Sequence, residues 1–211
     1  MSQNSHLQTP PIWRGAVADG AGIAGILVHG RTLTPDFMFE QAERLCMEHI
    51  AWCALAAHGN SWYPGKFMDP VEENQPMLDH ALACVDHAIR QALAKGYTHD
   101  RIALVGFSQG ACLLSEYMFR NPARWRALIA WTGGLIGPAG MQWPVRADQL
   151  KGVPVLLSNG DADPWVPLSR SRETADVFRG MGALVSERVY PARDHGIIDD
   201  EIGQARVLLG G

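Results

Sequence analysis

The sequence predicts an α/β fold in which helices cover both faces of a mostly parallel β-sheet. Short apolar runs rich in branched residues alternate along the chain with longer stretches whose apolar residues recur at helical spacing. Such alternation is typical of parallel sheets, because each helix carries the chain back to start the next strand. At 211 residues the chain is long enough for one sizeable core, so we expect a single domain over residues 1–211.

The apolar runs are the expected strands, because each is short, rich in branched residues and followed by a loop of Gly, Pro or polar residues. We expect strands at 22–28, 50–57, 101–107, 126–131, 153–158 and 184–190.

The helices are expected between these strands. The clearest begins at Pro76, where Leu78, Leu82 and Val85 start a series at helical spacing that ends near a capping glycine, Gly96. We expect the others at 36–49, 109–120, 168–180 and 196–209, and an irregular loop at 58–69. Ligands of such sheets bind beyond the carboxyl ends of the strands, so the chemistry is expected in the loops that follow them.

Composition excludes several classes of partner. The formal net charge is −4 and basic residues form no stripe, which argues against nucleic acid and anionic membranes and favours a small or neutral substrate. No apolar stretch approaches the ~20 residues that span a bilayer, and the polar start of the chain lacks the features of a secretory signal. We expect a cytoplasmic protein that is a monomer or a homodimer.

No metal or other cofactor is expected. The histidines form neither an HxH nor an HExxH spacing, so those outside the strand ends are interpreted as surface or core residues. The cysteines lack paired CxxC spacing and lie in apolar segments, which predicts reduced core residues. They are Cys46, Cys53, Cys84 and Cys112.

The strongest local signal is Gly106-Phe107-Ser108-Gln109-Gly110. It follows an expected strand and opens an expected helix, which is the context of a nucleophile elbow. The turn holds the serine in a strained backbone conformation and brings strand and helix close together, so the residues two before and two after it must be small. The helix start also favours developing negative charge near the hydroxyl. We therefore predict Ser108 as a nucleophile.

A serine nucleophile needs a base, and the base needs an orienting acid. The loop after the 153–158 strand contains Asp161 and Asp163, and we favour Asp163 because Asp161 sits in a Gly-Asp turn where it can bond to the backbone. The loop before the last helix contains His195, the expected base. His29, at the end of an earlier strand, is interpreted as a loop-positioning residue.

Acyl transfer also requires donors for the tetrahedral oxyanion. The backbone N–H of Gln109 is the expected first donor, and that of Arg31 the second, because Gly30 lets the loop turn toward the site. The Arg31 side chain has two interpretations: it binds a carboxylate or phosphate of the substrate, or it is a solvated surface arginine.

With these motifs in order, the chain resembles the phospholipase/carboxylesterase family of α/β-hydrolases, which includes acyl-protein thioesterases. The resemblance covers nearly the whole chain and rests on residues 27–30, 106–110, 160–167 and 194–196. It implies an α/β-hydrolase fold, the Ser108, Asp163, His195 triad, and the donors Arg31 and Gln109.

The segment 59–64 together with 29–31 is similar to a bacterial subgroup of predicted hydrolases, some associated with aromatic-compound metabolism. The chain departs from the family at Thr32, where members commonly carry glycine, which bears on the conformation of the loop that holds the second oxyanion donor. No long insertion forms a lid, so the site is either open or covered by the loop 58–69.

Trp62 and Tyr63 follow the end of a strand rather than lying in a periodic stripe, so we predict them as walls of a substrate pocket, with Leu135 as a third. The alternative is that the two aromatic residues pack the loop onto the sheet.

These residues predict a serine hydrolase that cleaves carboxylic esters through an acyl-enzyme. A thioesterase or a lactonase would use the same triad, and the sequence does not separate them. A protein that keeps the fold only to bind ligands is disfavoured because no triad member is lost, although a fold alone does not establish function. A cysteine-nucleophile hydrolase of the dienelactone type is disfavoured by the serine at position 108.

Overall fold

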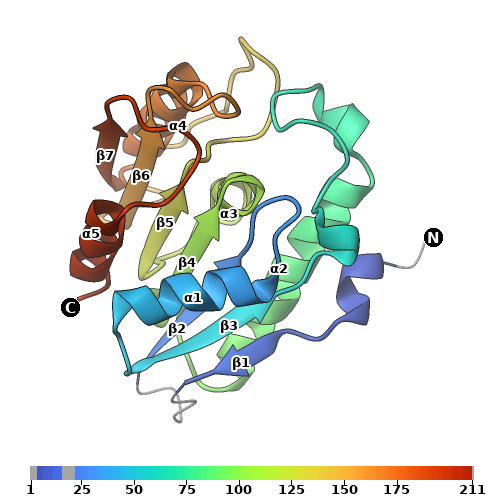
Figure 1. Ribbon diagram of the computed structural model, residues 1–211, viewed down its shortest axis with the longest axis vertical. Coiled ribbons are helices and arrows are strands. Elements are labelled where there is room, and N and C mark those ends of the chain that lie inside the picture. Colours follow the sequence, from blue (N-terminus) through green and yellow to red (C-terminus); the bar gives the residue numbers. More distant parts are fainter. Residues whose placement is uncertain (1–3, 16–21, 211) are drawn as a thin grey trace.

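The computed structural model describes residues 4–15 and 22–210, so the first three residues of the chain lie outside it. Its centre is a seven-stranded sheet in the order β1-β3-β2-β4-β5-β6-β7, in which only the β1–β3 pairing is antiparallel (Figure 1). The strands are β1 (Ile12–Arg14), β2 (Ile23–Val28), β3 (Ile50–Leu55), β4 (Ile102–Phe107), β5 (Ala127–Trp131), β6 (Pro154–Gly160) and β7 (Leu184–Tyr190). The predicted mostly parallel α/β architecture is confirmed.

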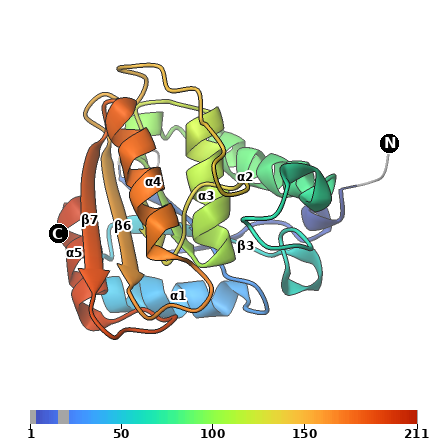
Figure 2. The same ribbon diagram turned by 90° about the horizontal axis from the view of Figure 1, so that it is seen from above.

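The described residues contain four α-helices that lie between strands, α1 (Pro35–Leu45), α2 (Met77–Ala94), α3 (Gln109–Arg120) and α4 (Leu168–Gly180), and a fifth, α5 (Asp199–Leu209), that follows β7. Helices α1 and α5 cover one face of the sheet, and α2, α3 and α4 cover the other (Figure 2). Because neighbouring strand residues point to opposite faces, Ile26 and Leu104 belong to the core under α2–α4, whereas Leu27 and Val105 belong to the core under α1 and α5.

Several expected boundaries were wrong. Helix α1 ends at Leu45, four residues early, because Cys46 takes a left-handed conformation with φ 53° that stops the helix. Cys46 is exposed rather than buried, unlike the other three cysteines. The last helix begins only at Asp199, so the chain after His195 stays irregular for three residues.

The structure also contains elements that the sequence did not predict. Strand β1 has only three residues and pairs antiparallel with β3 at the edge of the sheet. Before it, a short 3-10 helix, η1 (Ser5–Gln8), buries His6 completely, so this histidine is a core residue rather than a surface residue. Other 3-10 turns are η2 (His58–Asn60), η3 (Val71–Asn74) and η4 (His99–Arg101).

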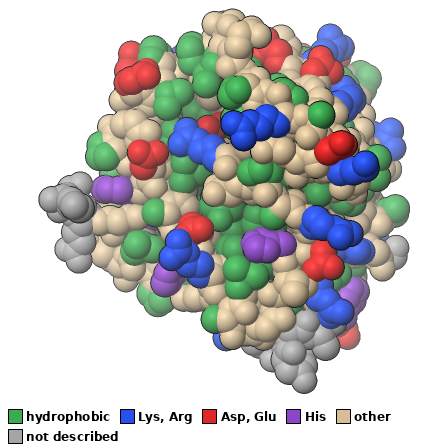
Figure 3. Space-filling view, turned by 180° about the vertical axis from the view of Figure 1, so that it is seen from behind, with side chains coloured by type: hydrophobic (Ala, Val, Ile, Leu, Met, Phe, Trp, Pro, Cys, Tyr) green, Lys and Arg blue, Asp and Glu red, His purple; other side chains and the backbone are tan. Residues whose placement is uncertain are grey.

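No helix in the described part of the chain is long and apolar enough to cross a membrane. On the face shown in Figure 3, basic and acidic side chains are interspersed.

Candidate active site

Ser108 lies between the end of β4 and the start of α3, with φ 55° and ψ −121°, a conformation that non-glycine residues rarely adopt. The turn is sharp enough that a Cβ atom at Gly106 would lie 2.7 Å from the backbone N of Ala111. A Cβ atom at Gly110 would lie 2.1 Å from the carbonyl oxygen of Val28, so α3 packs directly on the end of β2. Both glycines are therefore required by close backbone approaches, which is the physical basis of the GxSxG motif.

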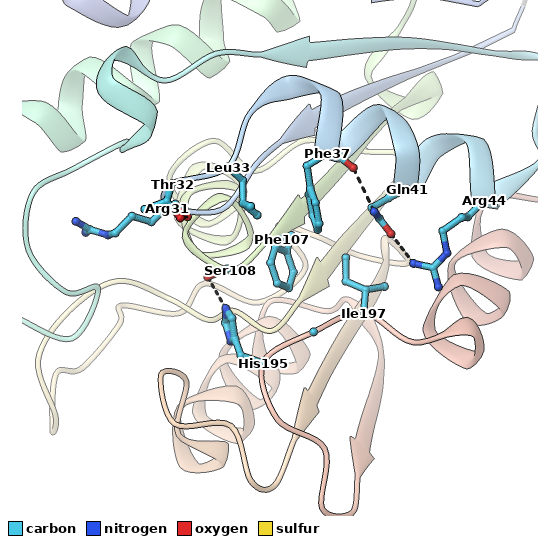
Figure 4. Close-up of a pocket in the computed structure, with 11 residues that line it drawn as sticks. Arg31, Thr32, Leu33, Phe37, Gln41, Arg44, Phe107, Ser108, His195 and Ile197 are labelled. Atoms are coloured by element: carbon cyan, nitrogen blue, oxygen red, sulfur yellow. Dashed lines mark hydrogen bonds between the residues drawn. The ribbon is translucent and has the colours of Figure 1, made fainter.

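Three side chains from three different loops form a continuous hydrogen-bonded chain. The Nε2 atom of His195 lies 2.8 Å from Oγ of Ser108, and its Nδ1 atom lies 2.8 Å from Oδ2 of Asp163. The Ser108–His195 bond is drawn in Figure 4. With Nδ1–H donating to the carboxylate, Nε2 is the acceptor that faces the serine hydroxyl.

The Asp163 carboxylate is held in place from a second side. Its Oδ1 accepts hydrogen bonds from the backbone N–H groups of Trp165 (2.8 Å) and Val166 (3.0 Å). Burial tends to raise the pKa of Asp163, but the hydrogen bonds from His195 and from these two amides lower it below its ordinary value. Asp161, the alternative acid, instead accepts from the backbone N–H of Ala192 at 2.6 Å.

The loop that carries His195 is fixed by a buried ion pair that the sequence alone does not reveal. Arg193 donates to the carbonyl oxygens of Asp194 and Gly196, on either side of the histidine, and its Nη2 lies 3.3 Å from Oε1 of Glu201. Glu201 is fully buried in the first turn of α5, and its Oε2 accepts from the backbone N–H of Ile198. A charged residue two positions before the histidine and an acid in the next helix are too common to reveal this pair in sequence.

Two backbone amides are available beside Ser108. Neither the N–H of Gln109 nor that of Arg31 donates a hydrogen bond to any other group in the residues described. The Arg31 loop lies close to the serine, because a Cβ atom at Gly30 would be 3.1 Å from Cβ of Ser108. The two amides that were predicted as oxyanion donors thus lie on loops that meet at the serine.

The side chains of these same two residues hold one peptide segment, residues 61–65. The guanidinium of Arg31 donates to the carbonyl oxygens of Tyr63 (2.9 Å), Pro64 (2.8 Å) and Gly65 (2.5 Å). The Gln109 amide accepts from the backbone N–H of Trp62 (2.9 Å) and donates to the carbonyl of Tyr63 (2.9 Å). The segment therefore ties the two loops together.

Two buried histidines complete this support. His29 accepts from the backbone N–H of Ala57 at Nε2 (3.1 Å) and has its Nδ1 2.7 Å from the carbonyl oxygen of Gly30, so the neutral ring carries its proton on Nδ1. His6 contacts the carbonyl of Trp62, and the indole N–H of Trp62 donates to the carbonyl of His29 at 2.8 Å. Burial lowers the pKa of both histidines. This geometry agrees with a loop-positioning role for His29.

Thr32 takes a left-handed backbone conformation with φ 67°. Its N–H donates to the carbonyl of Asn60 (2.8 Å) and its hydroxyl donates to the carbonyl of Arg31 (2.6 Å). The position thus requires the backbone that glycine adopts most easily, which accounts for the glycine expected there, and threonine reaches the same conformation in this chain.

A cavity of about 400 Å³ opens beside Ser108 and His195 on the side of α1. Its apolar walls are Leu33, Phe37, Phe107 and Ile197, and its lining also includes Arg31, Thr32, Gln41, Arg44 and Gly196 (Figure 4).

The structure does not place the three predicted pocket residues at this cavity. Trp62, Tyr63 and Leu135 are almost completely buried, and they belong to the core on the opposite face of the sheet, under α2–α4. The two aromatic residues pack the loop onto the sheet, which was the alternative interpretation. Arg31 is exposed, as expected of a surface arginine, but its guanidinium donates to three carbonyl groups and is therefore not free to bind a substrate anion.

The 58–69 loop does not line the cavity, although Arg31 joins the two. Across residues 4–15 and 22–210, no three His, Cys, Asp or Glu side chains cluster in the manner of metal ligands.

A serine on a strand–helix elbow, a histidine before the last helix and an acid after the preceding strand define the α/β-hydrolase class. Comparison with known proteins gives the family. The sequence profile of the phospholipase/carboxylesterase family matches residues 26–209, and the chain belongs to this family.

Individual relatives agree with this assignment. The crystal structure of a phospholipase/carboxylesterase from Dyadobacter fermentans is 39% identical and superposes with a TM-score of 0.88, covering 94% of this chain and 95% of that one. The Bacillus cereus carboxylesterase shares the fold, with a TM-score of 0.78 at 16% identity over 99% of this chain and 98% of that one.

An acyl-protein thioesterase 1 from Gibberella zeae is 27% identical over 124 residues, which cover 57% of this chain and 52% of that protein. The chain thus spans about half the length of the curated relatives it matches.

Proposed function

We propose that the protein is a serine hydrolase that cleaves carboxylic esters through an acyl-enzyme intermediate, with Ser108, His195 and Asp163 as its catalytic triad. The observation that carries this proposal is the hydrogen-bonded chain from Ser108 through His195 to Asp163, with both links at 2.8 Å. This is the geometry in which a histidine can remove a proton from serine while a carboxylate orients the ring.

In the first half of the reaction, Oγ of Ser108 attacks the ester carbonyl carbon and its proton passes to Nε2 of His195. Collapse of the tetrahedral intermediate breaks the bond to the alcohol oxygen, which leaves with that proton from His195. The acyl group remains on Ser108. In the second half, His195 takes a proton from water, the hydroxide attacks the acyl-enzyme, and the proton returns to Ser108 as the acid leaves.

Asp163 stabilises the imidazolium that forms in both halves. Its low pKa supports this role, because the carboxylate stays charged while the histidine is protonated.

The oxyanion of each tetrahedral intermediate accepts hydrogen bonds from the backbone N–H groups of Gln109 and Arg31. Their lack of another acceptor within the described residues supports this role, as does their position beside the serine. The segment 61–65 holds the two donors at a fixed spacing, since the side chain of each donor residue binds it.

A thioester substrate is the second candidate. It is favoured by the similarity to acyl-protein thioesterases, and the same triad and donors would serve it. Lactones are a third substrate type for the same groups.

Hydrolysis of p-nitrophenyl esters of increasing acyl length, acyl-CoA thioesters and simple lactones tests the proposal. We expect Ser108→Ala to lose turnover of every substrate that the wild type hydrolyses. Ser115→Ala, which removes a hydroxyl from the buried face of the same helix, is the matched control and is expected to keep it. Retained activity in a folded Ser108→Ala variant would refute the assignment.

A further inference from the structure

The cavity beside Ser108 has a polar far end that the proposed reaction does not use. Phe37, Gln41 and Arg44 are spaced four and three residues apart, so they line one face of α1. Figure 4 shows this row leading away from Ser108 and His195, with Arg44 at its end. Arg44 follows Phe37 by seven helical positions, which corresponds to about 10 Å along the axis.

Between Ser108 and Arg44 the cavity has apolar walls (Figure 4). Leu33 comes from the loop before α1 and Phe37 from the first turn of α1. Phe107 comes from the end of β4, and Ile197 from the loop after His195. The rings of Phe37 and Phe107 lie 5.3 Å apart between their centroids. Such walls favour the apolar arm of a substrate, whose burial is favourable in proportion to its area.

Arg44 has donors that a ligand could use. Its side chain is 35% exposed, and one of its terminal nitrogens is held by Oε1 of Gln41 at 2.5 Å. The other lies 2.7 Å from a carboxylate oxygen of Asp199, whose own side chain is fully exposed. An ion pair with such an exposed partner contributes little, so a ligand carboxylate could replace Asp199 at low cost.

The arginines that line the cavity, Arg31 and Arg44, give it positive charge. The guanidinium of Arg206 donates only to backbone carbonyls here, those of Arg44 and Leu45, so it adds a further positive charge that Asp199 does not offset. No Asp or Glu is among the described residues that line the cavity. A basic residue in the last turn also suits the helix dipole, but that preference does not explain why Arg44 faces the cavity.

We propose that the substrate is an ester that also carries a free carboxylate. One arm of the ester, on the acyl or the alcohol side, is an apolar chain that ends in this carboxylate, and Arg44 binds it. The apolar chain lies between Phe37, Phe107 and Ile197, and the carboxylate takes the place of Asp199 on the guanidinium. This inference rests on the proposed function, because it names the substrate of the same site.

The test compares charged and neutral substrates of matched length. One series consists of p-nitrophenyl monoesters of dicarboxylic acids beside neutral p-nitrophenyl alkanoates. The other consists of acetate esters of ω-hydroxy acids beside acetates of simple alcohols. Ser108→Ala serves as the blank for uncatalysed hydrolysis. In one of the two series, we expect the wild type to prefer the carboxylate-ended substrate by about tenfold in kcat/KM, which a hydrogen bond to a charged group supports.

Arg44→Met should remove this preference, and Arg44→Lys should keep part of it because the charge remains. Added salt should weaken it in the wild type. Arg90→Met is the matched control, since it removes an arginine that is paired with a carboxylate on α2, outside the cavity; it should leave the preference unchanged. Equal rates for charged and neutral esters in both series would overturn the proposal of a carboxylate-ended substrate. The proposal of a serine hydrolase would not be affected.

Calorimetric binding separates the two proposals. We expect the monomethyl half-ester of a dicarboxylic acid, or the acetate of an ω-hydroxy acid, to bind Ser108→Ala about tenfold more tightly than Ser108→Ala/Arg44→Met. Equal affinity of both variants for both ligands would overturn the role of Arg44 whether or not the wild type turns over any ester.

Discussion

Arg31→Met is expected to lower kcat with little change in KM, because the Arg31 side chain acts on the oxyanion site only through the segment 61–65. The substitution keeps the apolar stem and removes the three hydrogen bonds to the carbonyls of Tyr63, Pro64 and Gly65. The backbone N–H of residue 31 remains, but the loop that carries it is no longer tied to the loop of Gln109.

The expected size of the effect follows from these contacts. Complete loss of one oxyanion donor costs about 10²–10³ in kcat, so a donor that is present but loosely placed should cost roughly 10–100-fold. The bonds to Pro64 and Gly65 are exposed, and water can replace them. We therefore expect a loss of about 1–2 kcal/mol in the free energy of unfolding, and a fall of roughly 2–8 °C in Tm.

The assay is steady-state hydrolysis of the best p-nitrophenyl ester, with melting followed on the same samples. Arg179→Met is the matched control, because it removes an arginine of similar exposure that binds only Asp176 and Glu187. Arg31→Lys should recover part of kcat. A kcat within about twofold of the wild type, despite a lower Tm, would refute the positioning role, and a large rise in KM alone would indicate direct substrate contact.

Three further predictions concern single side chains. Asp163→Asn should lower kcat of ester hydrolysis by about 10³–10⁴-fold, because Asp163 orients His195. Asp161→Asn should keep kcat within about tenfold of the wild type, because the Asp161 carboxylate accepts only from a backbone amide. A larger loss of kcat in Asp161→Asn than in Asp163→Asn would make Asp161 the orienting acid. Cys46→Gly should raise the free energy of unfolding by about 0.5–1 kcal/mol, because glycine relieves the left-handed backbone at φ 53°, and a lower midpoint in urea would contradict this. Burial lowers the pKa of His29, so below about pH 6.5 the unfolded chain binds a proton that the folded chain does not, and stability falls as the pH falls. His29→Gln should therefore lose less stability than the wild type between pH 7 and 5 in urea titrations; an equal loss would disprove the contribution.

The strands could be predicted because parallel strands are buried on both faces and appear in the sequence as continuous apolar runs. The same property explains the failure at β1, whose three residues form an exposed edge and give no such run. The end of α1 at Leu45 was not predicted, because Cys46 takes a left-handed backbone conformation that cysteine rarely adopts.

The candidate triad could be predicted from motifs because each member lies in the loop that follows a strand, where this fold places its chemistry. The cavity could not be predicted from the sequence. Its walls depend on how α1 packs beside the end of β4 and the loop after His195, and spacing along the chain does not contain that arrangement. The one available signal was Gln41, a buried polar side chain on the core-facing side of α1. Trp62 was misplaced for a related reason, since a strand end does not reveal which face of the sheet the following loop will cover.

Reaction with a fluorophosphonate, followed by peptide mass spectrometry, tests the central claim most directly. We predict a single phosphonyl adduct on the peptide that contains Ser108, no adduct in Ser108→Ala, and strongly slowed labelling in His195→Ala, because the histidine must remove the serine proton. Absence of labelling in the folded wild type, or an adduct on a different residue, would contradict the assignment of Ser108 as the nucleophile.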